Sequence, residues 1–176
     1  PARQAAERMN RLLLMNTEQA NATALNFLDN HDTPRFFRFT GGSKDKLLCA
    51  LCAVFVFPGI PCVFYGTELP LDGAGDPDCR KTFDWTFKNR DCDFLNVFKA
   101  VLALKKEGAL KGGAVKSVTA ENGMLVIVRE NEHGKITAYF NTGGKSRRLE
   151  CGGSVLVSIN YKNNRLLNNG ALVVKV

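Results

Sequence analysis

The sequence changes its pattern at Gly112-Gly113, and this change limits the fold more than any other feature does. Before it, apolar residues recur at helical spacing in three segments, and two short β-type segments lie between them. The helix patterns cover residues 2–14, 43–55 and 93–107, and the strand patterns cover residues 23–28 and 62–65. Helices that alternate with strands are typical of α/β proteins with parallel strands.

After Gly112-Gly113 the sequence consists of short β-branched segments separated by turns that contain Gly or Asn. The segments cover residues 115–118, 124–129, 135–140, 154–159 and 171–176. Such spacing predicts a small antiparallel β-sandwich. We therefore expect an α/β part, residues 1–112, and an all-β domain, residues 113–176. A domain of about 64 residues is small for independent stability, so it should pack against the first part.

The composition excludes several classes of protein. With 45% hydrophobic and 23% charged residues over 176 positions, the chain is neither disordered nor a coiled coil. Its longest apolar run, from Leu47 to Phe57, has eleven residues and is too short to cross a bilayer, so no membrane association is expected.

The net charge of +7 comes mainly from residues 113–176, which hold nine Lys or Arg and four Asp or Glu. These basic residues are scattered, with Arg147-Arg148 as the one adjacent pair. A nucleic-acid surface would gather them on one face and add aromatic residues for stacking. The pattern instead indicates a solvated sheet surface, and no nucleic-acid partner is expected.

Six cysteines raise the question of disulfides or zinc. Cys49 and Cys52 lie three residues apart within an apolar helix pattern, where they act as small core side chains. No second cysteine or histidine pair completes four zinc ligands, so no metal site is expected. Reduced thiols favour a cytoplasmic location, with a secreted form as the alternative.

Candidate functional residues lie where the two predicted strands end. In parallel α/β folds, functional groups gather at the carboxyl ends of the strands. The first strand is followed by Asn30, His31 and Asp32, with Arg35 close behind, and the second is followed by Glu68. A carboxylate, an imidazole and a guanidinium together suit a substrate that carries many hydroxyl groups. Position alone leaves the alternative of a turn with a capping hydrogen bond.

Three motifs then resemble the α-amylase family of glycoside hydrolases. Residues 26–36 (NFLDNHDTPRF) resemble its fourth signature region, and residues 58–68 (PGIPCVFYGTE) resemble its eighth barrel strand. Residues 76–81 (DPDCRK), followed by Trp85, resemble the branch that contains neopullulanases, cyclomaltodextrinases and maltogenic amylases. The sequence departs from that branch at one place. The two residues before His31 are Asp29-Asn30, where the branch often has Gly-Ser, and Asp-Asn is closer to the pattern of general α-amylases.

The resemblance implies an eight-stranded (β/α)8 TIM barrel followed by an all-β domain. Residues 1–112 would supply the last two barrel strands with their helices, and residues 113–176 the β-sandwich. Because the sequence begins with Pro1 and its first helix has no N-cap residue, we expect that helix to continue a longer one. The rest of the barrel would pack against this chain, and a homo-oligomer is the alternative.

The resemblance also assigns roles. The family cleaves α-glucosidic bonds with retention, using one carboxylate as nucleophile and one carboxylic acid as proton donor. Both are expected upstream of this sequence. Asp32 resembles the family's third catalytic acid, which stabilises the cationic transition state. His31 resembles the imidazole that binds the same sugar. Asp76 and Arg80 resemble a pair that holds a more distant glucose, and Arg35 is a weaker candidate for substrate binding or for pairing with a carboxylate.

Other assignments from the resemblance are less specific. Phe36, Phe37 and Trp85 are candidates for stacking on sugars, with packing under the long loop as the alternative. An Asp32–Glu68 pair acting as a complete catalytic site is disfavoured, because the family's Y-G-x-E glutamate is not its proton donor. No cofactor is expected. Calcium occurs in the family, but no calcium loop maps onto this sequence.

The leading hypothesis is therefore the C-terminal part of an α-glucan hydrolase that carries part of the substrate cleft and lacks the bond-breaking pair. Its expected partner is an α-glucan oligosaccharide or polysaccharide. A non-catalytic carbohydrate-binding or assembly module is the alternative from a different functional class.

Overall fold

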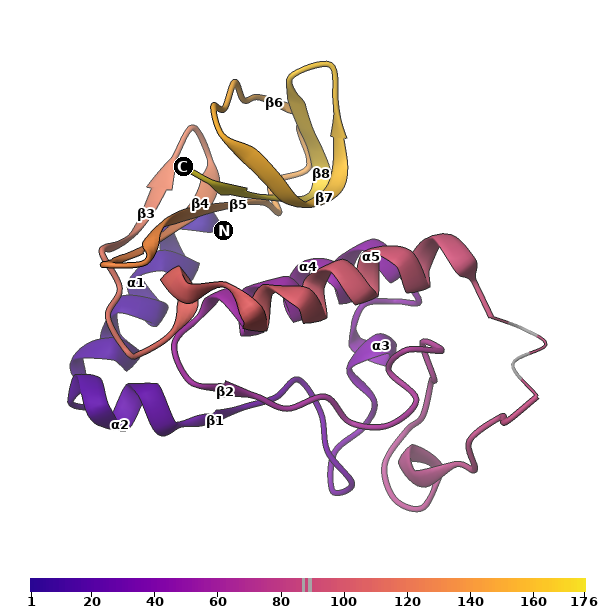
Figure 1. Cartoon of the computed structure of the whole chain (residues 1–176). Coiled ribbons are helices and arrows are strands. Elements are labelled where there is room, and N and C mark those ends of the chain that lie inside the picture. The colour runs from indigo at the N-terminus through magenta and orange to yellow at the C-terminus, as the bar shows by residue number, and fades with distance from the viewer. Residues whose placement is uncertain (87, 89) are drawn as a thin grey trace.

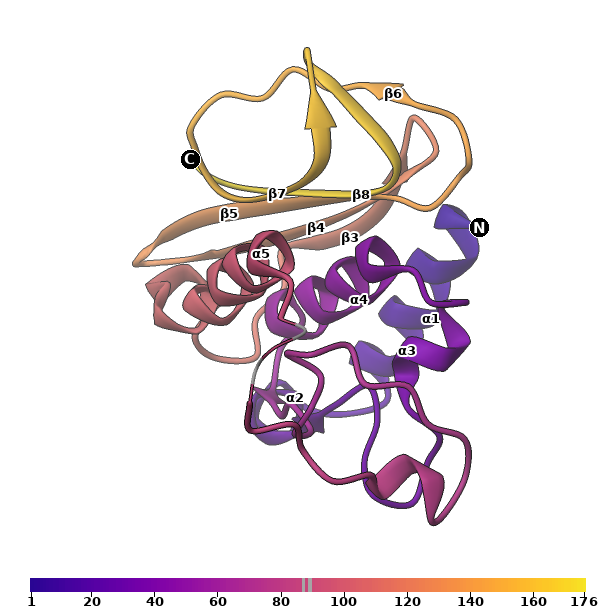
Figure 2. The same ribbon diagram turned by 90° about the vertical axis from the view of Figure 1, so that its right-hand side faces the viewer.

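The computed structural model describes residues 1–86, 88 and 90–176 and shows three layers (Figures 1 and 2). A curled antiparallel sheet forms one outer layer, and the helices α4 (Lys44–Val56) and α5 (Cys92–Ala103) lie beneath it. A pair of short parallel strands and the loops that follow them form the third layer. The two long middle helices therefore separate the sheet from the loops.

The helices begin where the sequence provides caps. The side chains of Ser43 and Asp91 accept hydrogen bonds from the backbone amides of Lys46 and Phe94, so they cap α4 and α5. The helix α1 (Ala2–Leu14) begins without a side-chain cap, as the sequence predicts. The remaining helical elements are α2 (Glu18–Thr23), α3 (Phe36–Phe39) and the 3-10 turns η1 (Asp78–Arg80), η2 (Leu104–Lys106) and η3 (Gly108–Leu110).

The expected parallel pairing is confirmed, although both strands are shorter than predicted. The strand β1 (Leu25–Asn26) pairs in parallel with β2 (Ile60–Pro61). The prediction of a strand over residues 62–65 is wrong in position, because the strand ends at Pro61 and only the Cys62 amide extends the pairing, to the Asn26 carbonyl at 2.7 Å. The chain then leaves the sheet direction in a turn at Gly66, whose φ is 82°.

The second half of the chain forms six antiparallel strands in one sheet, in the order β3-β4-β5-β8-β6, with β7 on the other edge of β8. The antiparallel prediction is confirmed. The Asn122-Gly123 and Asn163-Asn164 turns have positive φ values, as tight hairpins require. The strands are β3 (Ser117–Glu121), β4 (Met124–Asn131), β5 (Gly134–Asn141), β6 (Arg147–Arg148), β7 (Ser154–Lys162) and β8 (Arg165–Lys175).

The strands β3 to β8 form one sheet and not the sandwich of two sheets that the sequence predicts. The long strand β8 pairs with β6 near Arg165 and with β5 from Gly170 onward, while β7 follows it along its length with two irregularities in register. Because β8 takes part in both ends of the assembly, the strands remain one sheet that curls over itself (Figure 2). Sequence alternation predicts two covered faces but does not tell two sheets from one bent sheet.

The main hydrophobic core lies between the helices and one face of this sheet. Helix α4 contributes more buried residues than α1 or α5, since it is apolar on most sides and touches both neighbouring layers. A second, smaller cluster lies on the other face of the sheet, inside the curl, and consists of Met124, Leu149, Leu166, Leu172 and Val174. The first core joins residues from both sides of Gly112-Gly113, so the two parts share it; the boundary itself stays a prediction.

A buried arginine ties the sheet to the end of α4. Arg129 of β4 is 1% exposed, and its guanidinium donates hydrogen bonds to four carbonyl oxygens: those of Val56, Leu110, Gly112 and Ala114, at 2.6 to 3.2 Å. Burial lowers the pKa of Arg129 to about 10, so the group is still protonated at neutral pH. These hydrogen bonds hold residues 110–114, which connect the two parts of the chain, against the last turn of α4.

All six cysteines are free, and Cys49 and Cys52 are buried in the core as predicted. Within the part of the chain that the structure describes, no helix is both long enough and apolar enough to cross a bilayer.

Candidate functional site

The candidate site lies on the loops that follow β1 and β2. Because the two strands run parallel, both of their carboxyl ends point to the same side of the molecule, and the loops that leave them meet there. The first loop carries His31 and Asp32. The second loop is the long segment after Gly66. It carries Asp76, two positions before η1 begins, and Arg80, the last residue of η1.

His31 and Asp32 form an exposed pair. The His31 Nε2 and the Asp32 Oδ1 lie 3.2 Å apart, and the two side chains are 62% and 73% exposed. Their backbone is held by the turn beneath them, where the Asp32 amide donates to the Asn30 side chain at 2.9 Å and the Asn30 amide donates to the Thr33 hydroxyl at 3.1 Å. The turn fixes the backbone and leaves both functional groups open to solvent.

Asp76 and Arg80 form a second pair. The Arg80 Nε donates to the Asp76 Oδ1 at 2.7 Å, and the Arg80 Nη2 donates to the same oxygen. The single turn of η1 brings these two side chains together across four positions of sequence. Among the residues that the structure describes, none forms a hydrogen bond with the second carboxylate oxygen of Asp76 or with the Arg80 Nη1, so these groups can face a hydroxyl-bearing ligand.

The two pairs lie near each other, because the thiol of Cys79, one position before Arg80, donates to the His31 carbonyl at 3.3 Å. The pKa of the Asp76 carboxyl is lowered, mainly by the hydrogen bond from Arg80 and to a smaller extent by His31. The pKa of the Arg80 guanidinium is raised, mainly by Asp76 and to a smaller extent by the Asp32 carboxylate. The structure therefore brings four of the predicted site residues to one surface, with Asp76 held in its ionised form.

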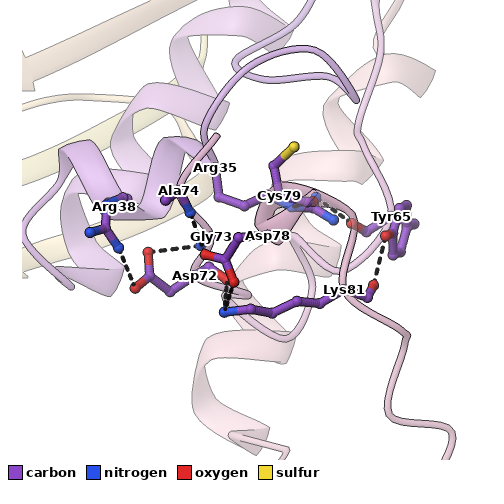
Figure 3. A network of polar contacts seen from close by, with 9 residues as sticks. All are labelled: Arg35, Arg38, Tyr65, Asp72, Gly73, Ala74, Asp78, Cys79 and Lys81. Atoms are coloured by element: carbon purple, nitrogen blue, oxygen red, sulfur yellow. Dashed lines mark hydrogen bonds and ion pairs between the residues drawn. The ribbon is translucent and has the colours of Figure 1, made fainter. Parts of the chain in front are cut away.

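A network of polar contacts connects residues of the second loop with one another and with Arg35, Arg38 and Tyr65 (Figure 3). The Lys81 ammonium lies 2.9 Å from the Asp78 carboxylate and donates to the Asp72 carbonyl at 3.2 Å. The pKa of Asp78 is lowered, mainly by the hydrogen bond that its carboxylate accepts from the Ala74 amide. The Tyr65 hydroxyl donates to the Lys81 carbonyl at 2.7 Å. These contacts connect the two ends of the second loop, because Lys81 binds Asp72 and Asp78 within the loop and Tyr65 just before Gly66.

Arg35 differs from its prediction. Its side chain is 2% exposed, and its guanidinium donates to the carbonyl oxygens of Cys79 at 2.7 Å and Tyr65 at 2.6 Å (Figure 3). These partners are backbone carbonyls instead of the carboxylate that the sequence suggested. This packing does not favour substrate binding by Arg35, because the loop covers the guanidinium, and that role stays a prediction.

Sequence reasoning gave no separate role to three residues beside this site. Asp29 is buried, and its carboxylate accepts a hydrogen bond from the Phe36 amide at 2.7 Å, which starts α3. Cys79 is fully buried between the two loops. Gly73 approaches η1 so closely that a Cβ atom would lie 2.7 Å from the Asp78 carbonyl oxygen. All three residues lie within or beside the motifs, but their structural roles depend on their burial, which the sequence does not show.

The aromatic candidates separate into two groups. Phe36 and Phe37 are half-buried and pack against the main core, so packing accounts for them. Trp85 is 80% exposed and meets the Phe83 ring edge-on at 4.8 Å between centroids. Trp85 is therefore the candidate whose ring is open to a sugar.

Among the residues that the structure describes, no group of three or more metal-binding side chains is present. The site as a whole offers two carboxylates, one imidazole and one guanidinium on an open surface. This set suits hydrogen bonding to several hydroxyl groups and electrostatic stabilisation of a positive charge.

Comparison with known proteins points to one family. The family model described as "Alpha amylase, catalytic domain" matches residues 3–124. A cyclomaltodextrinase from Bacillus sp is 34% identical over 136 residues, which is 76% of this chain and 24% of that protein. An intracellular maltogenic amylase from Bacillus subtilis is 38% identical over 102 residues, or 58% of this chain and 17% of that protein.

Neopullulanase 2 from Thermoactinomyces vulgaris is 29% identical over 144 residues, or 80% of this chain and 25% of that protein. The chain thus spans about a quarter or less of the length of these relatives. The fold resembles that of a debranching enzyme from Nostoc punctiforme soaked with acarbose, with a TM-score of 0.81 at 19% identity over 98% of this chain and 38% of that one.

Proposed function

The chain belongs to the α-amylase family of glycoside hydrolases, and we propose that it forms part of a retaining α-glucan hydrolase of the neopullulanase and cyclomaltodextrinase branch. In this proposal, Asp32 is the catalytic residue that the chain supplies. The nucleophile and the proton donor belong to parts of the catalytic domain that this sequence does not match. The single observation that carries the proposal is the contact of the two loops, where the Cys79 thiol donates to the His31 carbonyl at 3.3 Å and so brings the His31–Asp32 pair near the Asp76–Arg80 pair.

Asp32 acts on the transition state in this proposal. Cleavage of a glucosidic bond places positive charge on the sugar ring, and a carboxylate fixed beside the ring stabilises that charge more than it stabilises the neutral substrate. Asp32 sits on a turn held by two hydrogen bonds from backbone amides to the side chains of Asn30 and Thr33, so its position is set before the sugar arrives. His31, 3.2 Å away, donates to a hydroxyl of the same sugar.

Asp76 and Arg80 hold a glucose unit further from the bond that is cleaved. The ionised Asp76 accepts hydrogen bonds from sugar hydroxyls, and Arg80 both aligns Asp76 and donates to the sugar. An α-glucan is the proposed substrate, in keeping with the acarbose-soaked structural relative. We also propose an intracellular location, since one relative is named an intracellular enzyme.

We propose that β1 and β2 are the last two strands of an eight-stranded barrel whose other strands lie in the rest of the catalytic domain. Leu25 and Ile60, which lie opposite each other in this pair, are exposed apolar residues. An apolar pocket of about 500 Å³ opens beside it, between α1, β1 and α4, and includes Leu12, Phe27 and Phe57 in its lining. An open strand edge beside exposed apolar side chains favours a partner that completes the sheet.

Replacing Asp32 tests the proposed function. In the hydrolase that contains this chain together with the rest of its catalytic domain, Asp32→Asn should lower kcat for cyclodextrin or pullulan by about 100- to 1,000-fold, since it removes a fixed charge from the transition state. Melting temperature should stay unchanged, because the Asp32 side chain is exposed.

Asp93→Asn, which removes an exposed carboxylate in the first turn of α5, is the matched control and should leave kcat within about twofold of wild type. Wild-type turnover in the Asp32→Asn enzyme would overturn the proposal. Turnover by the 176-residue chain alone would contradict the proposed division between this chain and the rest of the domain.

A further inference from the structure

The two loops of the candidate site are joined by a buried contact that neither motif explains. Arg35 lies three positions after Asp32, at the start of α3, and Cys79 lies one position before Arg80, within η1. Both side chains are at most 2% exposed although the residues beside them on the site surface are open to solvent. The loops therefore meet through these two residues while the functional groups stay outside.

Arg35 holds three separate segments at once. Its backbone amide donates to the Gly73 carbonyl at 2.9 Å, its Nε donates to the Cys79 carbonyl at 2.7 Å, and its Nη1 donates to the Tyr65 carbonyl at 2.6 Å (Figure 3). These carbonyls belong to the segment after β2 and to both ends of the turn that carries Asp76. A planar guanidinium has donors pointing in several directions, so one side chain can connect segments that share no strand pairing.

Two aromatic rings lie against the charged guanidinium of Arg35. The guanidinium carbon lies 4.1 Å from the centre of the Phe64 ring and 4.6 Å from the centre of the Tyr65 ring. Such cation–π contacts stabilise a desolvated guanidinium without a neighbouring carboxylate. The Nη2 atom is buried and has no hydrogen-bond partner in the described ranges 1–86, 88 and 90–176, so the guanidinium is bound there through Nε and Nη1.

Cys79 completes the connection in the opposite direction. Its thiol donates to the His31 carbonyl at 3.3 Å, while its own carbonyl accepts the Arg35 Nε. The segment from His31 to Arg35 is thus attached to η1 at both of its ends. Asp32 lies on this segment, and Asp76 and Arg80 flank the part of the loop to which it is attached.

We propose that Arg35 and Cys79 form a clasp that sets the distance between the His31–Asp32 pair and the Asp76–Arg80 pair. Arg35 is a positioning residue in this proposal and does not touch the sugar. The effect of the clasp on sugar binding rests on the proposed function, whereas the clasp itself is a property of the fold and can be tested without any substrate.

The thiol of Cys79 reports directly on the clasp. In the wild-type chain, Cys79 should resist alkylation by iodoacetamide, because it is fully buried. Arg35→Met removes both guanidinium bonds and should raise the rate of Cys79 alkylation by about tenfold or more, the change expected from the loss of a hydrogen bond to a charged group. Peptide mapping by mass spectrometry gives the rate for each cysteine separately.

The chain contains its own controls. Cys49 and Cys52 lie in the main core, so continued protection of both shows that Arg35→Met still folds. Arg38 of α3 forms a half-exposed ion pair with Asp72, which lies on the loop that carries Cys79. Arg38→Met removes that pair and should leave Cys79 protected. Arg35→Lys keeps the charge but offers a single donor group, so it should give an intermediate rate.

An unchanged rate at Cys79 in folded Arg35→Met would overturn the proposal. If Cys49 and Cys52 also become reactive, the Arg35→Lys chain decides the question: a raised rate at Cys79 with the core cysteines protected supports the clasp, and equal rates at all three cysteines overturn it.

The complete hydrolase separates a positioning role from a structural one. Arg35→Met should raise KM and lower kcat for a maltooligosaccharide, each by about tenfold, because both pairs are displaced from their joint position. Arg38→Met should change neither value by more than about twofold. Altered kinetics without exposure of Cys79 would overturn the clasp. If Cys79 is exposed by Arg35→Met but the wild-type protein hydrolyses no α-glucan, the proposed function fails and the clasp stands.

Discussion

Two buried arginines show how differently the two outer layers of the molecule are held. Arg129 lies beside the main core, and four carbonyl oxygens accept its hydrogen bonds. Arg35 lies among the site loops, with two guanidinium bonds, two aromatic rings and one unbonded nitrogen. Around Arg129 apolar packing also holds the segments together, whereas around Arg35 polar contacts to the backbone carry most of the connection.

The burial of side chains in each region gives the physical reason. Seven of the thirteen residues of α4 are buried, so loss of one contact there leaves many others. Among the described residues of 60–90, only Gly66, Thr67, Gly73 and Cys79 are buried. A region with so little apolar burial depends on a few directed hydrogen bonds, and it can open locally while the rest stays folded.

The largest expected effect comes from deleting equal volumes in the two regions. Leu51→Ala in α4, where the side chain is 2% exposed, should lower the free energy of unfolding of the chain by about 4 kcal/mol, through lost apolar burial and a cavity. Leu25→Ala in β1, where the side chain is 58% exposed, should cost less than about 1 kcal/mol. Urea denaturation followed by circular dichroism measures both. Equal losses would show that the site layer is held as firmly as the core.

A somewhat smaller effect is expected from Arg129→Met. This change removes a guanidinium that is 1% exposed and donates to four carbonyl oxygens, and it should lower the free energy of unfolding by about 3 kcal/mol. Arg148→Met, at a side chain that is mostly exposed and pairs with Glu150, is the matched control and should change it by less than about 1 kcal/mol. If both variants lose the same amount, the buried bonds of Arg129 add nothing to the packing around them.

The smallest effect concerns pH at the site. The folded protein lowers the pKa of Asp76 below its ordinary value of 3.8, mainly through the Arg80 hydrogen bond. The pair therefore contributes stability above pH 3.8, and the contribution is lost as pH falls through the lower pKa of the folded state. The difference in stability between wild type and Asp76→Asn should be constant above pH 3.8 and shrink below it. A carboxyl titration by NMR that places Asp76 above 3.8 would contradict this.

The two regions also differ in how far sequence could predict them. Helix α1, the Ser43 cap and the antiparallel strands follow from periodicity and turn residues, because local preference and burial agree there. The short strand β2 and the four-residue helix α3 carry no periodic signal, so their bounds were not found. The curl of the sheet depends on how β8 bends, which alternation does not encode.

At the site, sequence reasoning found residues that lie together but not how they are held. His31, Asp32, Asp76 and Arg80 are exposed polar residues in motifs, and the structure brings them to one surface. Arg35 has the same guanidinium group as Arg80 and lies in the same motif as His31 and Asp32, yet it is buried. The residues next to Arg35 in sequence do not show whether its guanidinium faces solvent. The turn that covers it, residues 73–79, lies about forty positions away in sequence.

The central place of β8 has a consequence for the order in which the sheet can form during synthesis. Translation delivers β3, β4 and β5 first, and these can pair as successive hairpins as soon as they are made. The strands β5, β6 and β7 all have β8 as a partner, and β8 is the last of the six in chain order. Until β8 emerges from the ribosome, the second edge of β5 has no partner, and an open strand edge can pair wrongly or bind a chaperone.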